Sequence, residues 1–390
     1  MDNKKINLIQ SVLNSNLFYD NYEDAKEMKM LLKRYNETDN NSKIGYVSNV
    51  VSYGRALSMV HYTDIHGMYR DAERGALMDE YIKNTITDVV DGGDQTESTK
   101  EGYHVGGTQE AYMTGENELQ VLQETMLKKI GNKIKAACGG NHNDPELAVR
   151  KKDTYDNPVA VLYKAMGIPY YSKGVIIVDY IPLYDGKRSV GYAPHVTVLL
   201  HCGNGTPSKQ LDAANKNFLQ GMAVMAQFNK EHGTNFVPDL ILGGDYHSNT
   251  NLDMRVVREI RNKSGRVTGT YVKTIRTRNG ASQKRQNASS YDRSFPATHI
   301  CNATQYHITA NLNKNFDKNG FNYEPEYVFN YTEFEILKRH SNALSTLAEK
   351  YSTYRKDEDV SAKAKEIVKN MTNREKSETI FNVLEEKTND

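Results

Sequence analysis

Apolar and polar positions along the chain predict short buried strands that alternate with amphipathic helices. Between residues 57 and 138 the pattern gives strands and helices in turn, at 57–63, 70–84, 86–91, 117–133 and 134–138. Further apolar runs predict strands at 174–180, 195–200, 239–242, 254–260, 267–276 and 305–312. Strands that alternate with helices are typical of a sheet with helices packed on its outside. We therefore expect an α/β fold.

Both ends of the chain differ from this central region. Residues 6–14 and 21–35 predict helices, and Asp20 and Asn21 are suitable N-cap residues for the second. The polar stretch at 36–42 predicts a linker, and the last part of the chain is charged and again predicts helices. The expected organisation is a helical N-terminal extension at 1–51, a main domain at 52–333 and a charged helical C-terminal extension at 334–390.

Potential metal ligands follow five of the predicted strands. In chain order the segments are Asp64-Ile65-His66, Gly93-Asp94, Gly140-Asn141-His142, His201 and Gly244-Asp245-Tyr246-His247. Turns favour Gly, Asp and Asn for backbone reasons, which explains any one of these segments but not the whole ordered set. The C-terminal edge of a sheet is where α/β enzymes build their sites, and these side chains suit a hard or borderline metal ion. The pattern predicts a metal site.

The ordered set of segments resembles the calcineurin-like metallophosphoesterase superfamily. That family carries Asp-x-His, Gly-Asp, Gly-Asn-His, His and Gly-His-x-His motifs at strand ends, and the resemblance here runs from about residue 57 to about residue 250. It implies two stacked mixed β-sheets flanked by helices, with 52–333 as the catalytic domain. It also implies a metal-dependent hydrolase of phosphoric esters.

The resemblance implies two divalent ions about 3.5–4 Å apart, bridged by a carboxylate. The ligands it implies for the first ion are Asp64, His66, Asp94 and His247. Those for the second ion are Asp94, Asn141, His201 and Asp245. We expect extended segments at Asp64-x-His66 and at Asp245-x-His247, so that the two side chains of each segment point the same way and converge. Asp245 stands where the family has histidine, which favours Mn²⁺, with Fe, Zn or Mg as alternatives.

Two further residues are expected to act in catalysis. By resemblance, His142 contacts the phosphate and protonates the leaving oxygen, a role that suits imidazole near neutral pH. Glu97 stands three residues after Asp94, where some relatives carry a carboxylate that orients this histidine, and Asp144 is the alternative.

Two segments outside the motifs bear on the substrate. The long loop at 95–116 contains Tyr103 and His104, which we expect to bind substrate, and the loop is placed to act as a lid or to remain solvated. The segment 255–293 is strongly basic, and we expect Arg276 and Arg278 on it to bind a phosphate backbone. The same basic side chains could equally pair with acidic residues of the chain.

The charge distribution favours a nuclease that acts on DNA through a metal-activated water. A phosphodiesterase for small or cyclic nucleotides is the alternative, and a non-catalytic binding or assembly module on the same fold is a second one. Neither Gly-Asp nor Gly-Asn-His carries the arginine with which protein phosphatases of this superfamily hold a phosphomonoester.

Composition places the protein more broadly. The chain has 390 residues, three cysteines and a formal net charge of +1. It shows no apolar signal core and no run of about 20 apolar residues that could cross a bilayer. We expect a cytoplasmic protein without membrane contact, whose partners are nucleic acid or nucleotide substrates. Its terminal helices could support a homo-oligomer.

Overall fold

Strands are more common than helices in the part of the protein that the structure describes. The computed structural model describes residues 44–67, 70–96, 122–142, 158–201, 210–247, 249–262, 264–283, 301–314 and 325–337. The predicted helices at 6–14 and 21–35, the linker and nearly all of the C-terminal extension lie outside these ranges. Within them, no helix is long and apolar enough to cross a membrane.

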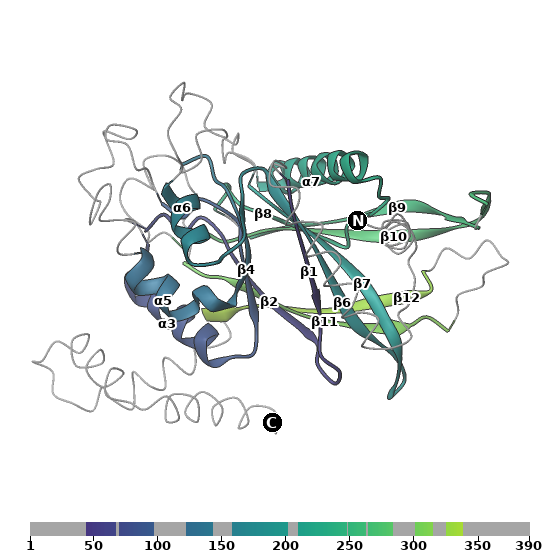
Figure 1. Cartoon of the computed structure of the whole chain (residues 1–390), viewed down its shortest axis with the longest axis horizontal. Helices are drawn as coiled ribbons and strands as arrows, with labels where there is room; N and C mark the ends of the chain where they lie inside the picture. The colour runs from purple at the N-terminus through teal and green to yellow at the C-terminus, as the bar shows by residue number, and fades with distance from the viewer. Residues whose placement is uncertain are drawn as a thin grey trace, which may run out of the picture.

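The described strands form a mixed sheet of 12 strands (Figure 1). They are β1 Ile44–Val50, β2 Leu57–Tyr62, β3 Asp88–Asp91, β4 Ile134–Cys138, β5 Tyr170–Tyr171, β6 Gly174–Asp185, β7 Arg188–Leu200, β8 Leu240–Gly243, β9 Thr250–Arg261, β10 Val267–Asn279, β11 Thr304–Leu312 and β12 Tyr327–Glu335. Their order is β5-β4-β3-β2-β11-β6-β7-β8-β10-β9, with β1 paired to β6 and β12 to β11. The α/β class is confirmed.

Helices cover the outer faces of the sheet. α3 (Ala72–Asn84), α5 (Lys128–Ile130) and α6 (Pro158–Ala165) lie on the β2–β4 half, and α7 (Gln210–His232) lies on the β7–β10 half (Figure 1). A π-helical turn at Gln123–Leu127 precedes α5, and a 3-10 turn at Gly131–Lys133 follows it. α3 begins where sequence analysis placed a helix, because Asp71 caps it by accepting a hydrogen bond from the Arg74 backbone N–H at 3.0 Å.

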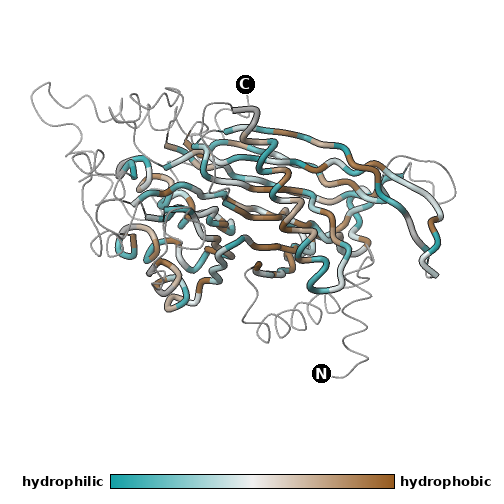
Figure 2. Tube along the Cα trace, turned by 90° about the horizontal axis from the view of Figure 1, so that it is seen from above, coloured by the Kyte–Doolittle hydropathy of each residue, from teal (hydrophilic) through white to brown (hydrophobic). Residues whose placement is uncertain are grey.

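The two halves of the sheet share a buried core between them. Met59 of β2 and Val90 of β3 belong to the same hydrophobic cluster as Ile177 of β6 and Leu199 of β7. Val60, next to Met59, packs instead against the helices, because successive side chains of a strand point to opposite faces. Figure 2 shows hydrophobic stretches along the strands in the middle of the molecule.

The expected pair of separate stacked sheets is found as one hydrogen-bonded sheet. The halves are joined where β11 pairs with β6, and this ladder contains only the pairs Ala310–Leu183 and Asn311–Tyr184. Apolar periodicity shows which faces are buried, but it does not reveal a ladder this short. The sequence prediction was therefore right about a mixed sheet in an α/β fold and wrong about the separation of that sheet into two.

Three strands lie where no strand was expected, namely the short β5 and the longer β1 and β12. β1 falls inside the range 1–51 assigned to the N-terminal extension, yet it pairs with β6 along its whole length. β12 ends at Glu335, inside the range 334–390 that was expected to be helical, and Ile336 starts the helical turn. The sheet therefore includes residues on both sides of the boundaries at 52 and 333.

Candidate metal centre

The predicted ligand segments meet at one edge of the sheet. β2, β3 and β4 are parallel to one another, and β7 is parallel to β8. Parallel strands present their carboxyl ends at the same edge, so the turns that follow them can converge. In chain order these turns carry Asp64, His66, Asp94, Asn141, His142, His201, Asp245 and His247.

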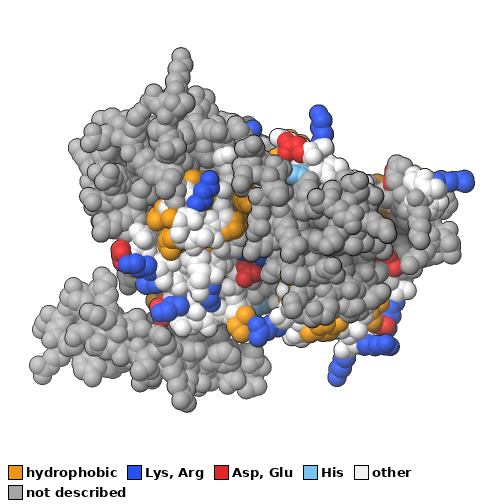
Figure 3. Space-filling view, in the orientation of Figure 1, with side chains coloured by type: hydrophobic (Ala, Val, Ile, Leu, Met, Phe, Trp, Pro, Cys, Tyr) orange, Lys and Arg blue, Asp and Glu red, His pale blue; other side chains and the backbone are white. Residues whose placement is uncertain are grey.

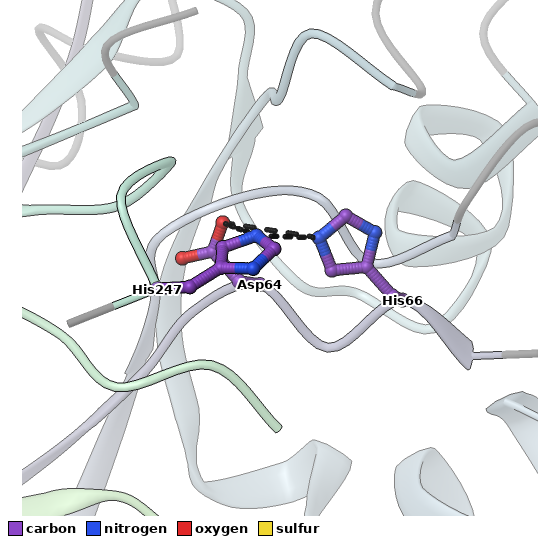
Figure 4. A group of neighbouring side chains, drawn as sticks. All are labelled: Asp64, His66 and His247. Carbon is purple, nitrogen blue, oxygen red and sulfur yellow. Dashed lines mark hydrogen bonds and ion pairs between the residues drawn. The ribbon is translucent and has the colours of Figure 1, made fainter. Parts of the chain in front are cut away.

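One side of the site is formed by Asp64, His66 and His247 (Figure 4). His247 Nε2 lies 3.1 Å from His66 Nε2 and 3.3 Å from Asp64 Oδ1. Asp64 and His66 are fully buried, whereas the His247 side chain is 13% exposed. The Asp245 backbone N–H donates to Asp64 Oδ1 at 3.0 Å and so holds the two segments together. Three potential ligand atoms therefore face one point that solvent can reach.

Asp94 lies at the centre of the site. Its Oδ2 is 3.0 Å from His201 Nε2 and 3.9 Å from the Nε2 atoms of both His66 and His142. Its Oδ1 accepts a hydrogen bond from the His142 backbone N–H at 2.9 Å. Asp94 Oδ2 is buried and accepts no hydrogen bond from the described residues. A buried carboxylate oxygen in this state is costly unless a cation neutralises it.

His201 completes the second side together with Asn141 and Asp245. His201 Nδ1 is 2.8 Å from the carbonyl oxygen of Gly92, so Nδ1 carries a proton and donates it there. His201 Nε2 then faces Asn141 Oδ1 at 3.0 Å, the nearby Asp94 carboxylate and Asp245 Oδ1 at 3.9 Å. In neutral imidazole this nitrogen carries a lone pair, which the oxygen lone pairs repel. Either a proton or a metal ion at this point removes the repulsion.

The backbone of the site is strained at the ligands themselves. Among the described residues, those other than glycine with positive φ are Asp64 (51°), His66 (45°), Asp94 (49°), Asp245 (83°) and His247 (53°). Such residues are uncommon and cluster at functional sites. We expected extended segments at Asp64 and His66, and this was wrong. Their side chains converge because of left-handed turns, which the hydrogen bond from His66 N to Asp94 O (2.8 Å) helps to hold.

Two glycines allow the turns to approach one another. A Cβ on Gly140 would lie 2.0 Å from Asp94 Oδ1 and 2.2 Å from Asp94 N. Gly93 has a φ of +101°, and a Cβ there would lie 2.7 Å from Gly139 O and 2.9 Å from His201 Nδ1. Both positions therefore require glycine for the ligands to reach their places.

A buried network that sequence analysis missed supports the turn at Asp94. Asp91 Oδ1 accepts hydrogen bonds from Gly93 N at 3.1 Å and from Gln95 Nε2 at 2.9 Å. Asp91 Oδ2 accepts one from the Tyr163 hydroxyl at 2.6 Å. Burial raises the pKa of Asp91 to about 6, although these donors oppose the rise. A carboxylate at the end of an otherwise apolar strand was the available signal for this role.

The electrostatics of the site favour a cation. Burial alone would raise the pKa of Asp94, but the charges of His201 and His142 hold it well below the ordinary value. Burial alone would lower the pKa of His201, but the Asp94 carboxylate raises it to about 10. Burial raises the pKa of Asp245 to about 6 against the opposing charge of His201. Positive charge is thus stabilised where the carboxylates converge.

The ligand atoms fit a metal ion. Two ligands about 2.1 Å from one ion and roughly at right angles lie about 3 Å apart. The separations of 3.0 Å around His201 Nε2 and of 3.1 and 3.3 Å around His247 Nε2 match this spacing. The site contains three groups of three side chains whose ligand atoms lie within 4.8 Å of one another, and Asp64, His66 and Asp94 each belong to two of these groups. Shared members are what a site for two adjacent ions requires.

The remaining predicted site residues have different outcomes. Glu97, Tyr103 and His104 lie outside the described residues, as does Asp144, so their roles stay predictions. His142 lies in the site, where its ring packs edge-on against that of His66 at 4.9 Å between centroids.

Arg276 and Arg278 both contact other residues of the chain. The Arg276 guanidinium stacks on the Tyr331 ring at 4.1 Å. Arg278 forms ion pairs with Glu333 at 2.8 Å and Asp253 at 2.6 Å. On the face that Figure 3 shows, the Lys and Arg side chains of described residues are scattered and form no single strip. Substrate binding by these two arginines stays a prediction.

Comparison with known proteins gives structural likeness only. No family model matches the chain, and no curated protein matches it. The structure is similar to a conserved uncharacterized protein, described as a predicted phosphoesterase, from Streptococcus pneumoniae TIGR4. That match has a TM-score of 0.27 and 11% identity, and it covers 71% of this chain and 98% of the other.

The structure is also similar to a 5'-nucleotidase from Candida albicans SC5314. The TM-score is 0.34 and the identity 11%, with 75% of this chain covered. The match spans 54% of the nucleotidase chain. Likeness at these levels carries no weight for function, so the function must be inferred from the side chains of the site.

Proposed function

We propose that this protein is a metallophosphoesterase that uses two divalent ions to hydrolyse phosphodiesters, with nucleic acid as the substrate. One observation carries the proposal: the seven predicted ligands come from five separate turns and converge, and five of them adopt positive φ. A sheet edge has no packing reason to place strained Asp and His residues around a buried carboxylate. A site built to hold cations does.

The side chains divide between two positions. Asp64, His66 and His247 would hold one ion, and Asn141, His201 and Asp245 the other, with Asp94 between them. Two ions bound there would supply Lewis-acid charge to a phosphoryl group and lower the pKa of the attacking water. Mn²⁺ is the ion we propose first, because Asp245 and Asn141 add oxygen ligands.

We infer that His142 moves a proton, although its ring nitrogen also belongs to one of the three groups of potential ligand atoms. Its backbone N–H is fixed by Asp94, and its side chain is 15% exposed, so the imidazole can reach a substrate that enters from solvent. A histidine beside the leaving oxygen can protonate it as the ester bond breaks. Its position supports the general-acid role.

The charges near the site support a diester over a monoester. Among the described residues, the ion pairs of the centre join histidines to aspartates and include no Lys or Arg. A monoester dianion is usually held by such a cation. This supports a substrate with one negative charge at the reacting phosphorus.

A small nucleotide diester is a second candidate substrate. Arg276 and Arg278, on which the nucleic-acid interpretation depended, both contact other residues of the chain. This weakens the expectation of a long basic surface for a strand. The third interpretation, a non-catalytic module, is opposed by the presence of a suitable side chain at each ligand position.

The first test combines metal analysis with cleavage. Purified protein would be loaded with Mn²⁺, and its metal content measured by mass spectrometry. Cleavage of end-labelled single- and double-stranded DNA, a cyclic dinucleotide and bis(p-nitrophenyl) phosphate would follow. We expect about two ions per chain, cleavage of the aryl diester and cleavage of DNA.

Asp94→Asn is the decisive variant, and Asp185→Asn is its matched control. Asp94 is 1% exposed at the centre, whereas the Asp185 side chain is 41% exposed and pairs with the exposed Lys314. Asp94→Asn should lose both ions and nearly all activity, and Asp185→Asn should lose neither. A folded wild type without bound metal would refute the hydrolase. Cleavage of the cyclic dinucleotide but not of DNA would select the second candidate.

A further inference from the structure

The edge strand β9 has the features of a pairing surface. β9 is the last strand in the sheet order, and within the described part of the chain it pairs only with β10. The two strands project as a hairpin beyond the end of α7 (Figure 1). Val257 is 67% exposed on this strand and Met254 is 38% exposed. An edge strand with exposed apolar side chains offers its backbone to another strand.

One face of β9 carries charges whose order is complementary to that of a second, antiparallel copy of the same strand. Arg255, Val257 and Glu259 are exposed and lie on the same face, because they alternate along the strand. In an antiparallel pair of identical strands centred on Val257, Arg255 of each copy stands opposite Glu259 of the other. Val257 then stands opposite its own copy. Opposite charges and apolar groups at facing positions stabilise a pair of strands.

The neighbouring registers are unfavourable. With a two-fold axis perpendicular to the sheet, each residue lies on the same face of the sheet as the residue opposite it. The axis must therefore pass through a residue, and the nearest alternative registers are centred on the residues next to Val257. A centre at Val256 would place Asp253 opposite Glu259, and a centre at Arg258 would place Arg258 opposite its own copy. Like charges directly opposite each other are destabilising. The charges therefore favour the register centred on Val257.

We propose that two copies of this chain form a symmetric dimer by antiparallel pairing of β9 with β9, centred on Val257. The sheet then continues across the two-fold axis, and each copy protects the exposed edge of the other. This surface is separate from the metal centre and does not depend on the proposed function. It also differs from the terminal helices that the sequence suggested as oligomer contacts.

Cysteine crosslinking tests the register. At the centre of an antiparallel pair, Cβ atoms are about 4.5–5.5 Å apart, close to the range for a disulfide. Val257→Cys should therefore form a disulfide-linked dimer under mild oxidation. Met254→Cys is the matched control, because two copies of residue 254 would be six residues, roughly 20 Å, apart along the pair. Cys138 and Cys301 are buried and should not interfere, and Cys202, which lies outside the described residues, would be replaced by Ser in both variants.

Charge reversal tests the pairs themselves. Arg255→Glu and Glu259→Arg should each raise the dimer dissociation constant at least tenfold by light scattering or ultracentrifugation, and the double variant should restore dimerisation. Arg266→Glu makes the same charge change at an exposed residue outside the pairs and should have no effect. Turnover should remain unchanged, and circular dichroism should show that each variant stays folded. The proposal would be overturned if the wild-type protein stayed monomeric over a 100-fold range of protein concentration. Equal crosslinking of the variants at 254 and 257 would also overturn it.

Discussion

The substitution Gly140→Ala tests how tightly the metal centre is built. The added Cβ would lie 2.0 Å from Asp94 Oδ1 and 2.2 Å from Asp94 N, although real Cβ atoms essentially never come within 3.0 Å of another atom. Asp94 or the Gly140 turn must therefore move by about 1 Å, the difference between 3.0 and 2.0 Å. The contact is with backbone as well as side chain, so rotation of Asp94 alone cannot relieve it.

A displacement of about 1 Å at the reacting centre can lower the rate about 100-fold. We therefore expect Gly140→Ala to reduce kcat/KM on bis(p-nitrophenyl) phosphate by about 100-fold and to weaken metal binding measured by calorimetry. Gly131→Ala is the matched control, because the atom nearest to its Cβ would be the flexible end of Met166, at 3.3 Å, and its other contacts would be at ordinary distances. It should leave both quantities unchanged. Wild-type kinetics and metal affinity in Gly140→Ala would refute the geometry described for Asp94.

Three further predictions address the chemistry and the core. His142→Asn should keep both ions, measured by mass spectrometry, and lose about 10²–10⁴-fold in rate; loss of metal would contradict its role as a general acid. Asp245→His should stay folded and shift the metal preference from Mn²⁺ towards Zn²⁺ in competition binding, and an unchanged preference would make this carboxylate incidental. Burial lowers the pKa of His195 from 6.5 to about 4, so the folded protein favours the neutral imidazole. The stability that depends on this neutral form is present above pH 6.5 and is lost as the pH falls through 4. Urea unfolding should show a loss on the order of 3 kcal/mol over that range, and His195→Gln should reduce it.

The ligand positions could be predicted because a few consecutive residues of the sequence identify each of them. A buried strand followed by glycine and a metal-binding side chain is visible in a few residues, and the edge at which parallel strands end brings such segments together. The backbone conformation of the ligands could not be predicted in the same way. Asp64 and His66 adopt left-handed φ because main-chain hydrogen bonds to Gly93 and Asp94, distant in sequence, hold them there.

The strands β1 and β12 illustrate a different limit. β1 begins with buried Ile44 and Tyr46 but also contains Ser48 and Asn49, and it follows a polar stretch that predicts a linker. β12 has aromatic residues at alternate positions only from Tyr327 to Tyr331, because Glu333 breaks the alternation, and it precedes a charged segment with helical character. Each strand is stabilised by its neighbour in the sheet rather than by its own pattern, so only the pairing reveals it.

The position of β11 in the sheet determines when the metal centre can form during synthesis of the chain. β11 pairs with β2 and β6, and the carbonyl oxygen of Asp64 accepts hydrogen bonds from Gln283 N and Ser282 Oγ, both at 3.0 Å. A chain emerging from the ribosome has Asp64 long before these partners exist, so contacts of this sequence separation form late. Chains truncated before Thr304 should accordingly bind no Mn²⁺ at this centre. If the protein is the hydrolase proposed above, a chain still being synthesised would have no complete metal centre until β11 has left the ribosome.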